Sequence, residues 1–84
     1  MRVIFAKAAL EDLTHWIDTD RKLALRIIRL INEIERDPFA GIGKPEPLRG
    51  DKSGYWSRRI NDERRLVYAI QGTDILVAQA HYHY

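Results

Sequence analysis

The sequence contains no cysteine, and that absence excludes several kinds of site. Without thiols the chain has no disulfide, no zinc–thiolate centre and no cysteine nucleophile, so packing alone must stabilise it, as in a reduced cytosolic protein. Long apolar runs are missing too: the longest, around Leu76, has the length of a strand and falls far short of the ~20 residues of a membrane span. The apolar stretch at the N-terminus is too short for a signal peptide. We therefore expect a soluble, cytoplasmic protein without a membrane partner.

The chain also carries little net charge, +2 over 84 residues, and this length suits a single domain spanning residues 1–84. Its 45% content of hydrophobic residues is too high for a disordered chain. The small net charge hides an uneven distribution, because every lysine and arginine beyond residue 37 falls within one short segment. These residues are Lys44, Arg49, Lys52, Arg58, Arg59, Arg64 and Arg65. Such a basic cluster favours a polyanionic partner.

The first half of the sequence predicts a short strand at residues 3–5 and then two helices. Apolar residues recur at helical spacing over residues 6–18, including Leu10, Trp16 and Ile17. The second helix has a continuous apolar stripe from Leu23 to Ile34, with Thr19 or Asp20 as its N-cap and Pro38 as its stop. Two amphipathic helices joined by a tight turn form an αα-hairpin.

Residues 38–54 hold all three prolines and four of the five glycines, which predicts a structured loop. Three strands follow at residues 55–60, 64–70 and 75–82, separated by turn residues that favour consecutive antiparallel hairpins. The order of helices followed by strands predicts an α+β fold, a small antiparallel sheet with the two helices packed on one face. Antiparallel pairing also brings Arg59 and Arg65 together across the turn between their strands.

Two patterns suggest ligands only weakly. Both histidines of the His81-x-His83 pair are expected on one strand face, but no carboxylate or thiol is adjacent to complete a zinc site. The glycine-rich segment 41–44 lacks the Gly-Lys-Ser/Thr ending of a phosphate-binding P-loop. His15 has the character of a surface residue and Trp16 that of a core residue. We therefore expect no metal and no cofactor.

A more informative group combines one acid, Glu46, with His83 and several arginines. These residue types suffice for RNA cleavage without metal: a base takes the 2′-OH proton, an acid protonates the 5′-oxygen and arginines hold the phosphate. Each member also has a simpler interpretation. Glu46 can be a solvated loop carboxylate, Arg59 and Arg65 exposed strand residues, and His83 with Tyr84 a frayed terminus.

Four segments are specific as a set: Pro38-Phe39-x-Gly41-x-Gly43-Lys44-Pro45-Glu46-Pro47-Leu48, Ser53-Gly54-Tyr55-Trp56-Ser57-Arg58-Arg59-Ile60, Arg65-Leu66-Val67-Tyr68-Ala69 and Tyr82-His83-Tyr84. With them, essentially the whole chain resembles the YoeB/Txe toxins of the RelE superfamily, from bacterial type II toxin–antitoxin systems. The resemblance implies a RelE-like, microbial-RNase-like fold. It also implies a ribosome-dependent endoribonuclease that cleaves mRNA in the decoding site and so inhibits translation. Arg49 and Arg64 depart from the family pattern, in which a lysine and a histidine are common at these positions.

By the same resemblance the catalytic residues are Glu46, Arg65, His83 and Tyr84, and Arg59 is a further active-site arginine. We assign Glu46 as general base and His83 as general acid, although either group can in principle hold either role. The basic cluster adds candidate phosphate-binding residues: Lys44, Arg49, Arg58 and Arg59. The implied partners are a cognate antitoxin, the ribosome with its mRNA, and a second copy of the chain, with DNA reached only through the antitoxin. The alternative is a catalytically silent protein that binds RNA, the ribosome or an antitoxin.

Overall fold

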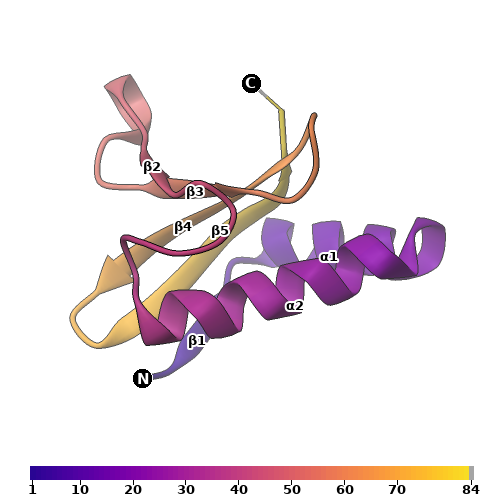
Figure 1. Ribbon diagram of the computed structural model, residues 1–84, viewed down its shortest axis with the longest axis horizontal. Coiled ribbons are helices and arrows are strands. Elements are labelled where there is room, and N and C mark those ends of the chain that lie inside the picture. The colour runs from indigo at the N-terminus through magenta and orange to yellow at the C-terminus, as the bar shows by residue number, and fades with distance from the viewer. Residues whose placement is uncertain (84) are drawn as a thin grey trace.

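Two helices and a five-stranded sheet make up the computed structural model of the chain, which describes residues 1–83 (Figure 1). The elements are β1 (Val3–Phe5), α1 (Lys7–Thr19), α2 (Arg21–Arg36), β2 (Glu46–Pro47), a 3₁₀ helix η1 (Gly50–Lys52), β3 (Trp56–Arg59), β4 (Arg65–Gln71) and β5 (Asp74–Tyr82). Within this part of the chain, neither helix has the length and apolar content needed to cross a membrane.

The predicted αα-hairpin is confirmed, with Asp20 as the one residue between its helices. Asp20 is the N-cap of α2 by position, but its carboxylate makes no capping hydrogen bond. Thr19, the other predicted cap, instead donates from its hydroxyl to the His15 carbonyl one turn back, at 2.7 Å. The tight joint is therefore held by backbone hydrogen bonds, including those from Leu23 and Ala24 to the Asp20 carbonyl.

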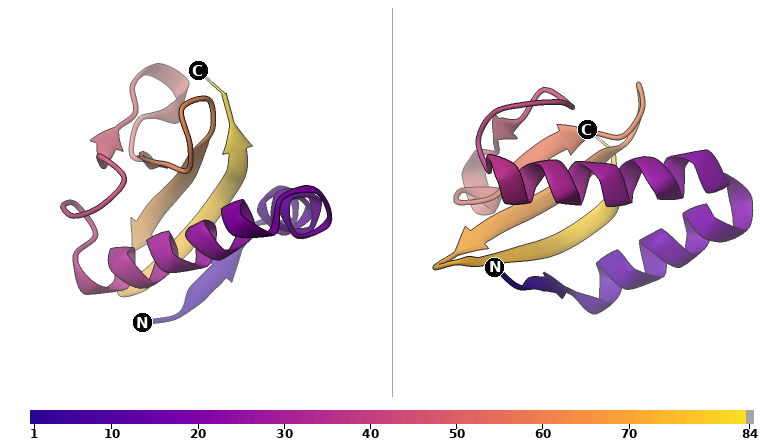
Figure 2. Two further views of the ribbon diagram at one scale, coloured as in Figure 1. Left: turned by 45° about the vertical axis from the view of Figure 1, so that its right-hand side comes forward. Right: turned by 60° about the horizontal axis from the view of Figure 1, so that its bottom comes forward.

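The sheet has the strand order β1-β5-β4-β3-β2. The two predicted hairpins, β3–β4 and β4–β5, are present and antiparallel. The sheet as a whole is mixed, because β1 pairs in parallel with β5 and so departs from the expected antiparallel arrangement. An ion pair between Arg2 Nη2 and Asp74 Oδ2, at 2.8 Å, fastens this edge. Figure 2 shows the N-terminal strand along the outer side of β5.

The predicted structured loop between α2 and β3 contains a short strand and a 3₁₀ helix. Glu46 and Pro47 form the edge strand β2, which pairs with Trp56 and Ser57 of β3, and η1 follows at once. Glu46 is therefore presented from a strand rather than from an irregular loop. Proline is compatible with this position because an edge strand leaves one side of its backbone unpaired.

The helices cover one face of the sheet and bury a single core between them (Figure 2). Its fully buried side chains include Ile27, Leu30, Leu66, Tyr68 and Val77. Trp16 belongs to this core, as predicted, and its indole nitrogen donates to the Ala80 carbonyl at 2.7 Å. Leu10 and Ile17, expected in the same apolar stripe, are 55% and 51% exposed because α1 turns Ala9 and Trp16 toward β5 instead.

Candidate functional site

The sheet face opposite the helices carries the residues that the sequence singled out. Directly opposed residues of neighbouring strands point to the same face, so the strand register defines rows across the sheet. One row runs Arg59, Arg65, Tyr82 across β3, β4 and β5. The next row runs Glu46, Ser57, Val67, Gln79 across β2 to β5. The register thus brings an acid and two arginines from three strands onto one surface.

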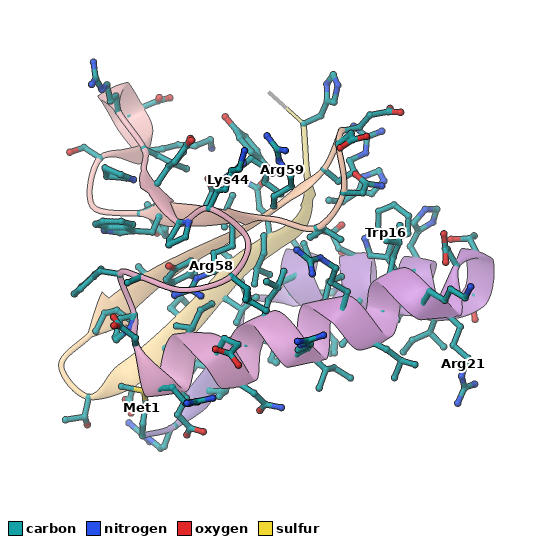
Figure 3. The ribbon with its side chains drawn as sticks, viewed as in Figure 1. Met1, Trp16, Arg21, Lys44, Arg58 and Arg59 are labelled. Carbon is teal, nitrogen blue, oxygen red and sulfur yellow. The ribbon has the colours of Figure 1, made fainter. Side chains whose placement is uncertain are left out.

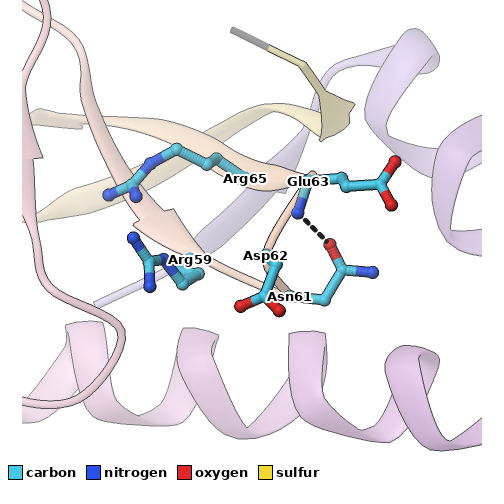
Figure 4. Close-up of a pocket in the computed structure, with 5 residues that line it drawn as sticks. All are labelled: Arg59, Asn61, Asp62, Glu63 and Arg65. Carbon is cyan, nitrogen blue, oxygen red and sulfur yellow. Dashed lines mark hydrogen bonds between the residues drawn. The ribbon is translucent and has the colours of Figure 1, made fainter.

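Arg59 and Arg65 pair directly across the β3–β4 hairpin, as their positions beside the turn predicted. They line a cavity of about 70 Å³ together with the turn residues Asn61, Asp62 and Glu63. Figure 4 shows both arginine side chains extending in the same direction from neighbouring strands. Two guanidinium groups that line one cavity can bind a phosphate together through charge-assisted hydrogen bonds, so this pair forms a candidate site for phosphate.

Arg65 is held in place by the sheet beneath it and is only 4% exposed. Its Nε donates to the Ser57 hydroxyl at 2.7 Å, and its Nη2 donates to the Lys44 carbonyl at 2.8 Å and the Ser57 carbonyl at 3.2 Å. Ser57 itself is fully buried. These contacts fix the orientation of the Arg65 guanidinium beside the Glu46 row. A side chain held in this way suits a preorganised anion-binding group.

Lys44 and Glu46 reach this face through the glycine-rich segment. The Gly43 carbonyl accepts from the Arg59 backbone N–H at 2.6 Å, and Lys44 adopts a left-handed backbone with φ of 50°. At Gly43 (φ 84°), an added Cβ would lie 2.9 Å from Leu30 Cδ2 and 3.1 Å from Arg58 Cβ. Gly43 is thus required for close packing of this segment on α2 and β3. The side chains of Lys44 and Glu46 remain exposed.

Arg58 does not fit the predicted phosphate-binding role, because its side chain is fully buried on the helix side of the sheet (Figure 3). It donates from Nη2 to the carbonyls of Asp37 (2.6 Å) and Ala40 (2.8 Å), and from Nη1 to that of Ile42 (3.1 Å). Its Nε donates to the Tyr68 hydroxyl at 3.2 Å. The guanidinium therefore holds the segment that leads into the glycine-rich turn, and sequence alone could not distinguish it from the adjacent Arg59.

Tyr68 completes this buried anchor. Its hydroxyl accepts from Arg58 and donates to the Pro38 carbonyl at 2.7 Å. Burial raises the pKa of the Tyr68 hydroxyl above its ordinary value, although the neighbouring Arg58 opposes that shift. The phenol therefore remains a neutral donor, and the loop after α2 is tied to the centre of the sheet.

Two supporting residues escaped the sequence analysis. Arg26 of α2 donates from Nε to the Ile60 carbonyl at 3.0 Å and from Nη2 to the Arg59 carbonyl at 3.2 Å. Ser57 is the other supporting residue, because its hydroxyl accepts a hydrogen bond from Arg65 Nε and so orients that side chain. The position of Arg26 beside the apolar stripe of α2 could have indicated its role, because a long side chain can bury its stem and reach a neighbouring element.

The remaining candidates lie around this surface. Lys44 and Arg49 are exposed, and Arg49 immediately precedes η1. His83 is also exposed, and it follows β5, whose last residue, Tyr82, is paired with Arg65. Tyr84 lies outside the described residues.

His81 does not share a strand face with His83, because β5 ends at Tyr82. Its ring instead packs on α1, with its centroid 5.1 Å from that of His15 and 5.0 Å from that of Trp16. Across residues 1–83, no three His, Cys, Asp or Glu side chains converge in a way that could hold a metal ion. His81 therefore belongs to the contact between α1 and the end of β5.

We expect this ring cluster to make stability depend on pH. Burial, followed by the positive charge of Arg64 and by His15, lowers the pKa of His81 below 6.5, while Asp12 acts in the opposite direction. As the pH falls, the unfolded chain therefore binds a proton at His81 before the folded protein does. The contribution of neutral His81 to stability is complete above about pH 6.5 and is lost as the pH falls through the lowered pKa. Urea denaturation between pH 7.5 and 5.5 should show declining stability, and His81→Gln should flatten the decline. An equal slope in the variant would exclude His81 as its source.

Comparison with known proteins gives independent information about the family of this chain. A family model described as the YoeB-like toxin of bacterial type II toxin–antitoxin systems matches residues 5–84. Toxin YoeB of Streptomyces coelicolor is 56% identical over 84 residues, which are 100% of both chains. Toxin RelK of Mycobacterium tuberculosis is 58% identical over 82 residues, covering 98% of this chain and 96% of that protein.

Solved structures agree with these matches. A YoeB/ParE toxin from Agrobacterium tumefaciens superposes with a TM-score of 0.96 at 43% identity, over 100% of both chains. The YoeB dimer from Staphylococcus aureus gives 0.93 at 40%, and YoeB in the heterotetrameric YoeB–YefM toxin–antitoxin complex of that species gives 0.90 at 40%; each covers 100% of this chain and 98% of the other. The RelBE2 complex of Mycobacterium tuberculosis, at 22% identity and 0.71 over 96% of both chains, shares the fold. The predicted RelE-like α+β fold is thus confirmed.

Proposed function

Because the chain belongs to the YoeB-like toxins of bacterial type II toxin–antitoxin systems, we propose that it is a ribosome-dependent endoribonuclease that cuts mRNA in the decoding site. The observation that carries the proposal is the sheet surface on which Glu46, Arg59 and Arg65 meet. An acid beside two arginines suits a reaction in which a proton is removed while negative charge develops on phosphate. Translation stops because the message is cut, and the activity belongs to the cytoplasm, where ribosomes work.

In the proposed reaction the RNA supplies its own nucleophile. Glu46 removes the proton from a ribose 2′-OH, the resulting oxygen attacks the adjacent phosphorus, and the bond from phosphorus to the 5′-oxygen breaks. His83 donates the proton that the leaving 5′-oxygen needs, which yields a 2′,3′-cyclic phosphate and a 5′-OH. Neither step requires a metal or another cofactor. The reverse assignment of acid and base uses the same atoms and predicts the opposite order of pKa values in the pH–rate profile.

The arginines stabilise the crowded phosphate in this scheme. Arg65 is positioned by Ser57 and the Lys44 carbonyl, and Arg59 faces the same cavity. Lys44 and Arg49 contribute positive charge at the rim, and Tyr84 stacks on an unstacked base. Arg58 is excluded from this set by its burial.

We also propose that the chain forms a homodimer and is held inactive by a cognate antitoxin, through which alone it acts on DNA. The related Staphylococcus aureus toxin has been solved as a dimer and in a heterotetrameric complex with YefM, which supports both partners.

Purified protein mixed with mRNA-programmed ribosomes provides the direct test, with cut ends mapped along the message. We expect cleavage in the decoding site. Cleavage should persist when a chelator removes all divalent ions except those that keep the ribosome intact. A folded protein that binds ribosomes but leaves every message whole would support the silent binding protein instead.

Binding should weaken steeply as salt is raised, because each phosphate contact releases counterions. On single-stranded RNA the expected slope of log K against log salt is about −0.7 for each phosphate neutralised. Replacing Arg59 with glutamine should therefore make the measured slope shallower by about 0.7. Arg29→Gln on the exposed surface of α2 is the matched control and should leave the slope unchanged. An Arg59 variant with the parental slope would show that this side chain contacts no phosphate.

A further inference from the structure

A second hollow lies on the same sheet face as the Arg59–Arg65 cavity. It measures about 160 Å³ and is lined by Asp51, Lys52, Tyr55, Val67, Ala78 and Gln79. Val67 is only 2% exposed and forms its floor, while Asp51 and Lys52 of η1 form its rim. Nothing in the proposed cleavage reaction uses these residues. We call this hollow, with its six lining residues, the η1 pocket.

The strand register places the η1 pocket beside the proposed phosphate site. Val67 lies directly between Ser57 and Gln79 in the row that begins at Glu46. Ser57 is the residue whose hydroxyl accepts the hydrogen bond from Arg65 Nε. Neighbouring strands are about 4.8 Å apart and residues two apart along a strand about 6.6 Å, so the pocket is one nearest-neighbour step from the Arg65 row.

Positive charge and an aromatic ring connect the two hollows. Tyr82 is paired with Arg65 on one side, and Lys52 Nζ lies 5.5 Å from the centroid of the Tyr82 ring. Lys52 is therefore both at the rim of the η1 pocket and next to the row of arginines. A strand of RNA whose phosphate occupies the Arg59–Arg65 cavity can place a second phosphate near Lys52 and turn the intervening base toward Val67.

The lining chemistry suits a nucleobase. Tyr55 offers an aromatic surface, Val67 and Ala78 an apolar floor, and Gln79 an amide that both donates and accepts hydrogen bonds. Proteins that read single-stranded RNA stack its unstacked bases on aromatic side chains and bond their exposed edges. The volume is below the ~300–1,000 Å³ of typical small-molecule sites, so the pocket accommodates a single ring system rather than a whole nucleotide.

We propose that the η1 pocket binds one unstacked base of the mRNA, in a nucleotide next to the scissile phosphate, and that Gln79 and Tyr55 select it. The proposal rests on the proposed endoribonuclease function and deepens it. Tyr55 supplies stacking that any base can use, whereas Gln79 distinguishes bases by the pattern of donors and acceptors on their edges. Cleavage-site preference would then originate in a pocket separate from the reacting groups.

The test uses the full chain on ribosomes programmed with messages whose decoding-site nucleotides are randomised. Gln79→Leu should change the ratio of cutting between bases at one position by about 10-fold, within the range of a lost base-specific contact, by lowering kcat/KM on the preferred message. Tyr55→Leu should raise KM by roughly 5- to 100-fold for all messages through lost stacking. Gln71→Leu, the same change at an exposed glutamine at the end of β4, should alter neither. Thermal melting establishes that each variant is folded.

A message with an abasic nucleotide at the affected position separates a base contact from a general loss of activity. On this message the KM of the parental protein should rise about as much as Tyr55→Leu raises it on the intact message. The KM of Tyr55→Leu should not rise further when the base is removed. Cleavage patterns of both variants identical to the parental pattern, or losses that add on the abasic message, would overturn the proposal while leaving the endoribonuclease function standing. A parental protein that cuts no programmed message would overturn both.

Discussion

Replacing Glu46 by glutamine is expected to lower mRNA cleavage by at least ~100-fold while leaving the fold intact, because loss of a general acid or base typically costs 10²–10⁴-fold. Glutamine keeps the size and hydrogen-bonding capacity of the side chain but cannot accept the 2′-OH proton. Glu46 is exposed on the edge strand β2, where glutamine has nearly the same shape, so we expect the variant to fold. Single-turnover cleavage on programmed ribosomes measures the chemical step directly, and the loss should appear in kcat rather than in KM.

Glu35→Gln provides the matched control, since Glu35 is an exposed glutamate on α2, on the helical side of the molecule. It should cut at the parental rate. If a folded Glu46→Gln protein also cuts at the parental rate, Glu46 has no part in proton transfer. The simpler interpretation of this residue as a solvated carboxylate would then hold.

Replacing Arg58 by methionine is expected to destabilise the protein by at least about 3 kcal/mol, because the variant loses several hydrogen bonds from a charged donor, each of which contributes roughly 1.5–3 kcal/mol. The carbonyls of Asp37, Ala40 and Ile42 all lose their side-chain donor in this variant. A chain of this length has a total stability of roughly 4–13 kcal/mol, so the loss would be a large part of it. Urea denaturation followed by tryptophan fluorescence gives the difference.

Arg29→Met, at an exposed position of α2, controls for loss of an arginine and should change stability by less than about 0.5 kcal/mol. Arg58→Lys keeps the charge but lacks the planar fork that reaches several carbonyls at once, so we expect it to recover only part of the loss. A methionine variant within about 1 kcal/mol of the parental protein would show that water or rearrangement satisfies these carbonyls.

Local patterns in the sequence predicted most of the fold. The periodicity of apolar residues located both helices, and turn residues located the two hairpins that align Arg59 with Arg65. The parallel pairing of β1 with β5 escaped prediction because it joins residues about 72 positions apart, exemplified by Arg2 and Asp74. Strand β2 was not predicted either, because it has only two residues, one of them a proline, and so carries no alternation of polar and apolar side chains.

For the candidate site, the sequence did not show which of two neighbouring side chains faces the cavity. Arg58 and Arg59 are neighbours of one type, and only the phase of β3 decides which of them faces the core and which faces the cavity. Sequence grouped both with the phosphate-binding residues. The η1 pocket was equally hidden, since it forms only where η1 folds back over β4 and β5.

The order of the strands has a consequence for how the protein is synthesised. β5 is the last strand to leave the ribosome, yet it lies inside the sheet between β1 and β4, and α1 packs on it through Trp16 and Asp12. Until β5 emerges, the first strand has no partner and the first helix has no surface to cover. A chain that stops before β5 therefore lacks the strand on which both β1 and α1 depend, and it cannot complete the core.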